Sequence, residues 1–232
     1  MSAINAIRKS FSTIVFDCDG VVLDSNRIKT DAFRQVAQYY GSDAADALVQ
    51  FHVERGGISR YRKFEYFLEH ILQETANELS VRELADAYGE RVYKELLQCG
   101  ITPGLRELRK ATANQSWMIV SGGDQAELRR VFMARKLEGL FDRGIHGSPT
   151  AKEAIVDREI ASKNLELPAL FIGDSRYDHE VASRAGLKFL FVSGWSEFPD
   201  WQAYCEEHRI PVISHVGDLL STREIDFQNL LP

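Results

Sequence analysis

Short apolar runs rich in β-branched and aromatic residues recur along the chain, each flanked by glycine, aspartate or serine. Runs of this kind are typical of strands buried inside a sheet. Strands are predicted over residues 12–16, 117–120, 170–172 and 189–192. Helices are predicted where apolar positions recur with a helical period, over residues 104–112, 125–137, 150–164 and 177–185, the last closed by Gly186.

The order of these elements predicts the fold class. Strand and helix alternate from about residue 101 onward, and the strands are too apolar to face water on either side. Such strands form a mostly parallel sheet with helices on both faces. We therefore expect a doubly wound α/β fold with a Rossmann-like core.

The stretch that follows the first strand breaks this alternation. It contains no convincing strand, and its helical patterns cover residues 28–40, 43–51, 59–72 and 80–97. We expect an inserted α-helical domain over residues 24–100 and a core formed by residues 1–23 and 101–232. The chain would leave and rejoin the core through two short connections, which permit hinge motion.

Composition and charge limit the classes of molecule that the protein is expected to bind. The 232 residues include 34 acidic and 28 basic side chains, so the net charge of −6 offers no electrostatic surface for nucleic acid or anionic membrane. Three widely spaced cysteines form no CxxC pair, which favours a reducing compartment. No run approaches the roughly 18 apolar residues of a membrane span. We expect a cytoplasmic protein, a monomer or small homo-oligomer, that acts on a small molecule.

Carboxylates directly follow two of the predicted strands. Asp17 and Asp19 come after the first strand, and Asp174 and Asp178 come after the strand that ends at residue 172. In open α/β sheets ligands bind at the carboxyl ends of strands, so we expect Asp17, Asp19 and Asp174 to lie close together. Like charges at close range repel unless a cation lies between them, and Mg²⁺ prefers oxygen ligands. The sequence therefore predicts a Mg²⁺ site.

Two weaker signals fall at the same edge of the sheet. Ser121 and Gly122 follow the second strand and offer a hydroxyl group and an unhindered backbone amide to a phosphate. The same segment would serve equally well as the N-cap of the next helix. Lys152, near the start of a helix, could point its charge at the site or face solvent as most helical lysines do.

Taken together, in this order and each at a strand end, these segments resemble the signature of the haloacid dehalogenase superfamily of phosphohydrolases. The resemblance rests on Asp-x-Asp-Gly-Val-Val at residues 17–22 and Leu-Asp-Ser at residues 23–25. It continues with Ser121, Lys152 and Gly-Asp-Ser-x-x-Asp at residues 173–178. The order of these weak motifs makes the match specific.

The resemblance implies a mechanism and a role for each residue. Asp17 would attack phosphorus to form an aspartyl-phosphate, and Asp19 would protonate the leaving oxygen and then deprotonate water. Mg²⁺ would bind Asp17, the Asp19 carbonyl group and Asp174. Ser121, Gly122 and Lys152 would bind the phosphate. Asp178 would orient Lys152 or a metal-bound water.

The helical insertion resembles the mobile cap that in this superfamily closes over the site and selects the substrate. Its segment Gly-Gly-Ile-Ser-Arg at residues 56–60 resembles the substrate loop of β-phosphoglucomutases, which implies that Arg60 binds an anionic group of the substrate. An ordinary helix start capped by Ser59 explains the segment equally well. The identity of the substrate would depend on this insertion.

Several activities remain open within the superfamily. We expect a phosphatase of small phosphomonoesters, such as sugar phosphates or phosphoglycolate-like metabolites, with a β-phosphoglucomutase-like phosphotransferase as the alternative. Lys29 stands where those mutases carry a histidine, and residues 121–125 lack their lysine, so hydrolysis is preferred. Asp19 disfavours a dehalogenase. A phosphonatase would need a cap lysine such as Lys29 or Lys63, although lysines on a helix usually face solvent.

A noncatalytic, receiver-like Mg²⁺-binding or regulatory protein is the alternative from a different class. Receivers also gather aspartates and a lysine around Mg²⁺ in an α/β sheet, but they have no helical insertion after the first strand. They also have no use for a leaving-group acid such as Asp19. The sequence therefore favours an enzyme.

Overall fold

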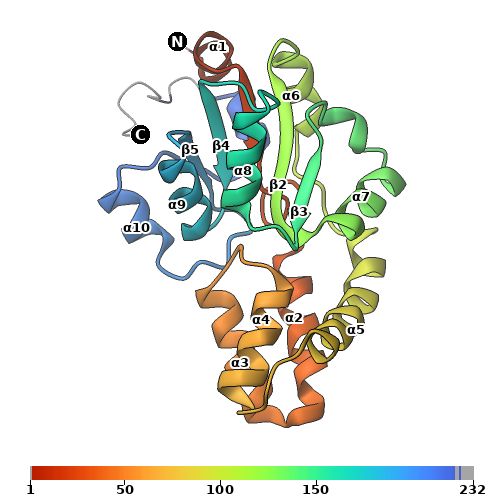
Figure 1. Ribbon diagram of the computed structural model, residues 1–232. Coiled ribbons are helices and arrows are strands. Elements are labelled where there is room, and N and C mark those ends of the chain that lie inside the picture. Colours follow the sequence, from red (N-terminus) through yellow and green to blue (C-terminus); the bar gives the residue numbers. More distant parts are fainter. Residues whose placement is uncertain (1, 223–224, 226–232) are drawn as a thin grey trace.

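The computed structural model describes residues 2–222 and residue 225, and its centre is a single parallel sheet (Figure 1). The six strands pair in the order β3-β2-β1-β4-β5-β6. Their bounds are Thr13–Phe16 for β1, Ser116–Asp124 for β2, Ile145–Ser148 for β3, Ala169–Gly173 for β4, Lys188–Val192 for β5 and Val212–Ile213 for β6. β1 lies at the centre of the sheet, with β2 and β4 as its neighbours.

Helices cover both faces of the sheet because successive strand side chains point to opposite faces. Ile14 and Phe16 of β1 pack in the same apolar cluster as α1 (Ala3–Ser10), α6 (Leu105–Ala111) and α7 (Gln125–Ala134). Val15 packs in the opposite cluster. That cluster includes side chains of α8 (Lys152–Ala161), α9 (Arg176–Arg184) and α10 (Trp201–Glu207). The expected doubly wound α/β fold is confirmed.

The α-helices of the inserted cap are gathered beyond one end of the sheet (Figure 1), and the cap also contains a 3-10 helix, Gln38–Tyr40, and a π-helix, Phe67–Ile71. The α-helices are α2 (Asn26–Ala37), α3 (Ser42–Glu54), α4 (Arg60–Tyr66) and α5 (Glu78–Leu96). Its apolar centre is aromatic, with the ring of Phe33 4.3 Å from that of Tyr88 and 5.2 Å from that of Phe64. An α-helical insertion was expected here, and it is present.

The two connections between cap and core lie side by side. The backbone amide of Asp24 donates to the carbonyl oxygen of Gly100 at 2.9 Å, and Leu23 forms an isolated antiparallel bridge with Ile101. The chain thus leaves and rejoins the core through paired strand-like segments. This arrangement is compatible with the predicted boundaries at residues 24 and 100, which remain a prediction.

The sequence patterns did not predict α1, β3, α10 or β6, nor the short 3-10 helices Glu138–Leu140 and Val216–Leu220. β3 has the sequence Ile-His-Gly-Ser, and β6 has only two residues, so neither shows an apolar run. Each is defined by its pairing with a neighbouring strand, β3 with β2 and β6 with β5, which the local sequence does not reveal. Across the described part of the chain, no helix has the length and apolar character needed to cross a membrane.

Candidate active site

Asp17 lies at the carboxyl end of β1, in the middle of the sheet edge that faces the cap. Its side chain is 3% exposed, and its backbone amide donates to the carbonyl oxygen of Ile172 in β4 at 2.9 Å. The chain then turns through Gly20, whose φ of +74° lies in the left-handed region. A Cβ atom at Gly20 would lie 2.1 Å from Oδ2 of Asp174, so only glycine permits this close approach.

Three buried carboxylates meet at this edge: Asp17 directly follows β1, Asp174 directly follows β4, and Asp178 lies in the first turn of α9. Oxygen atoms of Asp17, Asp174 and Asp178 all lie within 4.8 Å of one another. Asn26, at the start of α2, donates through Nδ2 to Oδ2 of Asp174 at 2.7 Å and to the carbonyl oxygen of Trp195 at 2.8 Å. Of the three aspartates that the sequence expected to converge, Asp17 and Asp174 do lie together, whereas the third member of the cluster is Asp178 and not Asp19. Asn26, a residue of the cap, fixes the position of Asp174.

Burial and mutual repulsion disfavour the ionised forms of these carboxyl groups. Burial, with added repulsion from Asp178 and Asp19, raises the pKa of Asp17 to about 7 although Lys152 opposes the rise. Burial and the charges of Asp17 and Asp178 raise the pKa of Asp174 well above its ordinary value. Negative charge thus exceeds what Lys152 neutralises. A cluster of hard oxygen ligands with excess negative charge fits a divalent cation such as Mg²⁺.

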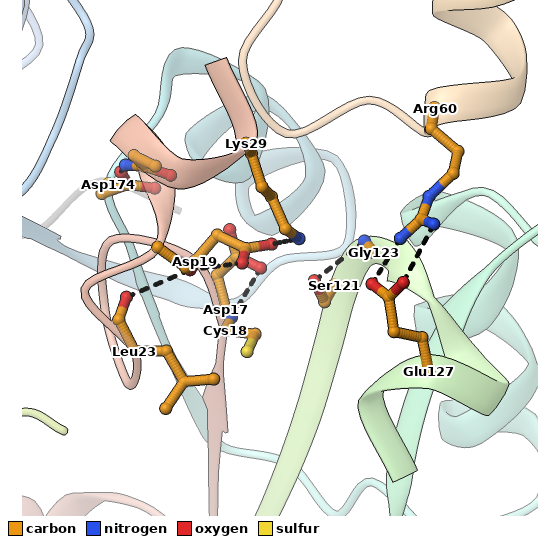
Figure 2. A network of polar contacts seen from close by, with 12 residues as sticks. Asp17, Cys18, Asp19, Leu23, Lys29, Arg60, Ser121, Gly123, Glu127 and Asp174 are labelled. Atoms are coloured by element: carbon orange, nitrogen blue, oxygen red, sulfur yellow. Dashed lines mark hydrogen bonds and ion pairs between the residues drawn. The ribbon is translucent and has the colours of Figure 1, made fainter. Parts of the chain in front are cut away.

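The carboxylate of Asp19 points away from this cluster, toward the cap (Figure 2). Its Oδ2 lies 2.5 Å from Nζ of Lys29, and its Oδ1 accepts a hydrogen bond from Oγ of Ser25 at 2.6 Å. Burial would raise the pKa of Asp19, but Lys29 and Ser25 together hold it below its ordinary value. A metal ligand at Asp19 would therefore be its backbone carbonyl group, as the sequence resemblance implies, because its side chain is held by Lys29 and Ser25.

Lys152 is fully enclosed at the N-terminal end of α8. Its Nζ lies 3.0 Å from Oδ2 of Asp17 and 2.5 Å from Oδ1 of Asp178, and the residue is 1% exposed. Burial alone would lower the pKa of this ammonium group, but Asp17 and Asp178 raise it. Lys152 is therefore a cation held beside Asp17. The alternative that Lys152 faces solvent, as most helical lysines do, is wrong.

Asp178 holds this lysine in place. Its Oδ1 accepts from Lys152, and its Oδ2 accepts from Oγ of Ser175 at 2.6 Å. Both carboxylate oxygens are thus occupied by side chains of the site. This geometry matches the expected role of Asp178 in orienting Lys152.

Ser121 lies in the second half of β2, where its buried Oγ accepts a hydrogen bond from the backbone amide of Gly123 at 3.0 Å (Figure 2). The N-cap of α7 is instead Asp124, whose Oδ1 accepts from the backbone amide of Glu127 at 2.9 Å. The structure therefore rules out Ser121 as the N-cap of that helix and leaves its hydroxyl group at the sheet edge.

Arg60 extends from the cap to the core and is neutralised there (Figure 2). Its Nη2 lies 2.5 Å from Oε1 of Glu127, and its Nη1 lies 3.0 Å from Oε2, so the pair is bidentate. Arg60 and Glu127 are 6% and 7% exposed. Arg60 borders the cavity described below, but its charge is already balanced, so in this structure it joins cap to core. Its expected role as an anion ligand stays a prediction.

The Arg60–Glu127 pair should contribute to stability as a unit. Replacing Glu127 with methionine would leave a buried guanidinium group without its carboxylate, and we expect a loss of about 3 kcal/mol in the free energy of unfolding. Replacing both residues with methionine should recover most of that loss, because no charge is then left buried. Urea unfolding of the two single variants and the double variant measures these changes in the free energy of unfolding.

Glu166→Met is the matched control, because Glu166 pairs with Arg143 at 2.8 Å on the surface and is 53% exposed. We expect it to cost no more than about 1 kcal/mol. A double variant that loses the sum of the two single losses would contradict the coupling of Arg60 and Glu127.

A cavity of about 510 Å³ lies between cap and core. Asp17, Asp19 and Asp174 line its core side. Lys29, His52, Phe33, Lys63, Tyr88 and the loop of residues 53–58 line its cap side. Sequence reasoning had not picked out Asn26, His52 or Glu127, because nothing in their local patterns distinguishes them from surface polar residues. The cavity has the size and the mixed lining of a small-molecule site.

The fold and this site define a class: α/β enzymes whose acidic site, at the carboxyl edge of the sheet, is covered by a helical cap. The family model of the haloacid dehalogenase-like hydrolases matches residues 14–192, and the chain belongs to that family. The superfamily and the hydrolase class predicted from the sequence are confirmed. No curated protein matches the chain in sequence.

Solved structures give the same fold. A predicted phosphatase from Clostridium acetobutylicum is 18% identical with a TM-score of 0.69, covering 91% of this chain and 96% of that one. A β-phosphoglucomutase from Clostridium difficile is 17% identical, with a TM-score of 0.67 and coverages of 90% and 92%. A predicted phosphoglycolate phosphatase from Haemophilus somnus is 16% identical, with a TM-score of 0.65 and coverages of 91% and 97%. At these identities the likeness shows the fold alone.

Proposed function

We propose that this chain is a Mg²⁺-dependent phosphatase that hydrolyses small phosphomonoesters through an aspartyl-phosphate on Asp17. The observation that carries the proposal is the contact of Asp17 with Lys152 at 3.0 Å inside a cluster of buried carboxylates. A nucleophile, a fixed cation and a set of oxygen ligands thus share one enclosed site.

In the first step an oxygen of Asp17 attacks phosphorus, and the bond from phosphorus to the ester oxygen breaks. The departing alkoxide takes a proton from Asp19 and leaves as an alcohol. Asp19 must carry a proton at this stage, so its ion pair with Lys29 at 2.5 Å has to loosen when substrate binds. Lys152 and the hydroxyl group of Ser121 face the charge that develops on the phosphoryl oxygens.

In the second step water attacks phosphorus, the bond to Asp17 breaks, and inorganic phosphate leaves. Asp19 accepts the proton of the attacking water, a role that its ionised form, stabilised by Lys29 and Ser25, can perform. Bound Mg²⁺ would supply countercharge to the phosphoryl group and to the carboxylates of Asp17 and Asp174. Full closure of the cap would exclude bulk water from the cavity.

The experiment that tests this function is phosphate release over a panel of metabolite phosphomonoesters. With Mg²⁺ we expect turnover of at least one ester, and with EDTA we expect less than about a tenth of that rate, since the carboxylate cluster then lacks its countercharge. β-Glucose 1-phosphate belongs in the panel, because a mutase would convert it to glucose 6-phosphate without releasing phosphate. A rate of phosphate release that is the same with EDTA as with Mg²⁺ would contradict the proposal.

Metal binding can be measured without turnover. Mg²⁺ at about 100 times its dissociation constant should stabilise the folded protein by about 2.7 kcal/mol, seen as a rise in melting temperature. Asp174→Asn should remove most of this rise, because it deletes a ligand charge. Asp86→Asn, on the exposed face of α5, is the control and should retain the rise.

A further inference from the structure

Three buried cations at the junction of cap and core each have a carboxylate partner. Lys152 pairs with Asp17 and Asp178. Lys29 pairs with Asp19, and Arg60 pairs with Glu127, as Figure 2 shows. These pairings follow the general rule that buried charges are paired, because an isolated ion loses its hydration on burial.

Lys63 on α4 departs from that rule. It is 2% exposed and lines the cavity, yet no carboxylate among the described residues lies within 4.0 Å of its ammonium group. Its Nζ instead lies 2.5 Å from Nδ1 of His52 and 3.5 Å from the carbonyl oxygen of His52, and 5.4 Å from the centre of the Phe33 ring. It is a buried ammonium group held only by neutral acceptors and an aromatic ring.

The groups in contact with Lys63 supply no negative charge to balance its ammonium group. Burial, Lys63 itself and Lys29 lower the pKa of His52 well below its ordinary value, so the imidazole is neutral and supplies no countercharge. Burial, Lys29 and Lys152 lower the pKa of Lys63 to about 7, although Asp19 opposes this. An anion bound beside Lys63 would remove the cost of keeping the ammonium group charged.

We propose that Lys63, oriented by His52, binds a carboxylate group of the substrate, so that the substrate class is phosphomonoesters of short hydroxy acids. One ammonium group matches the single charge of a carboxylate, whereas a second phosphate group would need more countercharge. Asp17 and Lys63 line the same cavity, and one small molecule would place its phosphate at the first and its carboxylate at the second. This proposal rests on the proposed phosphatase function.

The subsite is tested with esters that differ only in the anion. 2-Phosphoglycolate carries a carboxylate, ethyl phosphate has a methyl group in its place, and ethanediol bisphosphate carries a second phosphate. We expect wild-type protein with Mg²⁺ to prefer 2-phosphoglycolate to ethyl phosphate in kcat/KM by at least about tenfold, the size of one charge-assisted hydrogen bond. In Lys63→Met this ratio should fall to near one, and Lys63→Arg should restore part of it.

The control variant is Lys94→Met, which removes an exposed lysine of the same cap and should retain the preference. Lys63→Met replaces an unpaired buried charge with an apolar side chain of similar length, so it should fold. The proposal is overturned if wild-type protein shows no preference for 2-phosphoglycolate over ethyl phosphate. It is also overturned if Lys63→Met retains that preference. A stronger preference for the bisphosphate overturns the assignment to a carboxylate.

The pH dependence of the preference gives a second readout that a structural role would not produce. The charged groups near Lys63 are Lys29 of α2, Lys152 of α8, and Asp19 and Glu197 of the core loops, with the neutral His52 of α3. Because Lys63 loses its proton as the pH rises past about 7, the preference for 2-phosphoglycolate should weaken above that pH, by up to tenfold per unit. A preference that is flat from pH 6 to pH 9 contradicts binding by an ammonium group.

Failure of the subsite and failure of the phosphatase function can be told apart. Titration calorimetry of Asp17→Asn with the same esters measures binding without turnover. If wild-type protein releases no phosphate from any ester but Asp17→Asn binds 2-phosphoglycolate more tightly than ethyl phosphate, the function fails and the subsite stands. If borohydride traps a carbonyl compound on Lys63, the amine is a nucleophile and the proposed subsite is wrong.

Discussion

Replacing Asp17 with asparagine is expected to abolish phosphate release, lowering kcat by about four orders of magnitude or more, as loss of a nucleophile does elsewhere. The amide keeps the shape of the side chain but cannot form the acyl-phosphate. Acid-quenched wild-type protein should carry one phosphoryl group when examined by mass spectrometry during turnover, and the variant should carry none. Asp86→Asn should behave as the wild type.

The same substitution should not destabilise the metal-free protein. The pKa of Asp17 is raised from its ordinary value to about 7. The folded wild type therefore holds a proton that the unfolded chain releases, and its stability falls as the pH rises through that interval. Asparagine carries no charge and avoids this loss, while Lys152 keeps its contact with Asp178 at 2.5 Å.

Thermal unfolding in EDTA at pH 8 measures this second effect. We expect the melting temperature of Asp17→Asn to equal or exceed that of the wild type. An inactive variant with a much lower melting temperature would mean that Asp17 stabilises the fold. A stable variant that retained more than about a hundredth of the activity would exclude Asp17 as the nucleophile.

The acidic edge of the sheet could be predicted from the sequence because the signal is local. Asp17 and Asp174 each follow an apolar run directly, and parallel strands align their carboxyl ends at one edge. Positions relative to a strand end were therefore sufficient to expect Asp17 and Asp174 together. They did not show that the carboxylate of Asp19 would instead contact Lys29. The identity of the neighbouring strand was not needed, although β1 and β4 do pair directly.

The contacts between cap and core could not be predicted in this way. Arg60 and Glu127 are 67 positions apart, and each has the helical spacing of an ordinary surface residue. Lys63 looked like part of a solvated helix face, yet it is 2% exposed because it packs against His52 and Phe33 of two neighbouring cap helices. Such placements depend on how separate elements pack against one another. The periodicity of one helix carries no information about that contact.

Replacing Gly122 with alanine should prevent the cap from closing over the site. A Cβ atom at residue 122 would lie 2.0 Å from the carbonyl oxygen and 2.8 Å from the carbonyl carbon of Gly57, in the cap loop that faces the site. Both contacts are with backbone atoms, so no side chain can move aside to relieve them. The loop must retreat from the core, and the site then opens to water.

We expect Gly122→Ala to lower kcat/KM by about a hundredfold, the usual cost of misplacing catalytic groups by about 1 Å. The variant keeps the backbone amide at residue 122, so an amide contact with phosphate is not what is lost. Gly56→Ala is the matched control, because Gly56 precedes Gly57 in the same cap loop and its Cβ atom would meet its nearest neighbour, Cβ of Ser175, at an ordinary 3.6 Å, so its loss should be much smaller.

The Mg²⁺-dependent rise in melting temperature separates closure from damage to the core. The clash of Gly122→Ala is with the cap, while Asp17 and Asp174 lie on the core side of the cavity, so the variant should retain the rise seen in the wild type. Lost activity with intact metal binding would show that the chemistry depends on the closed cap. Closure normally assembles such sites and excludes water, so a loss of activity is expected. Activity within about threefold of the wild type would instead mean that catalysis does not require the closed cap.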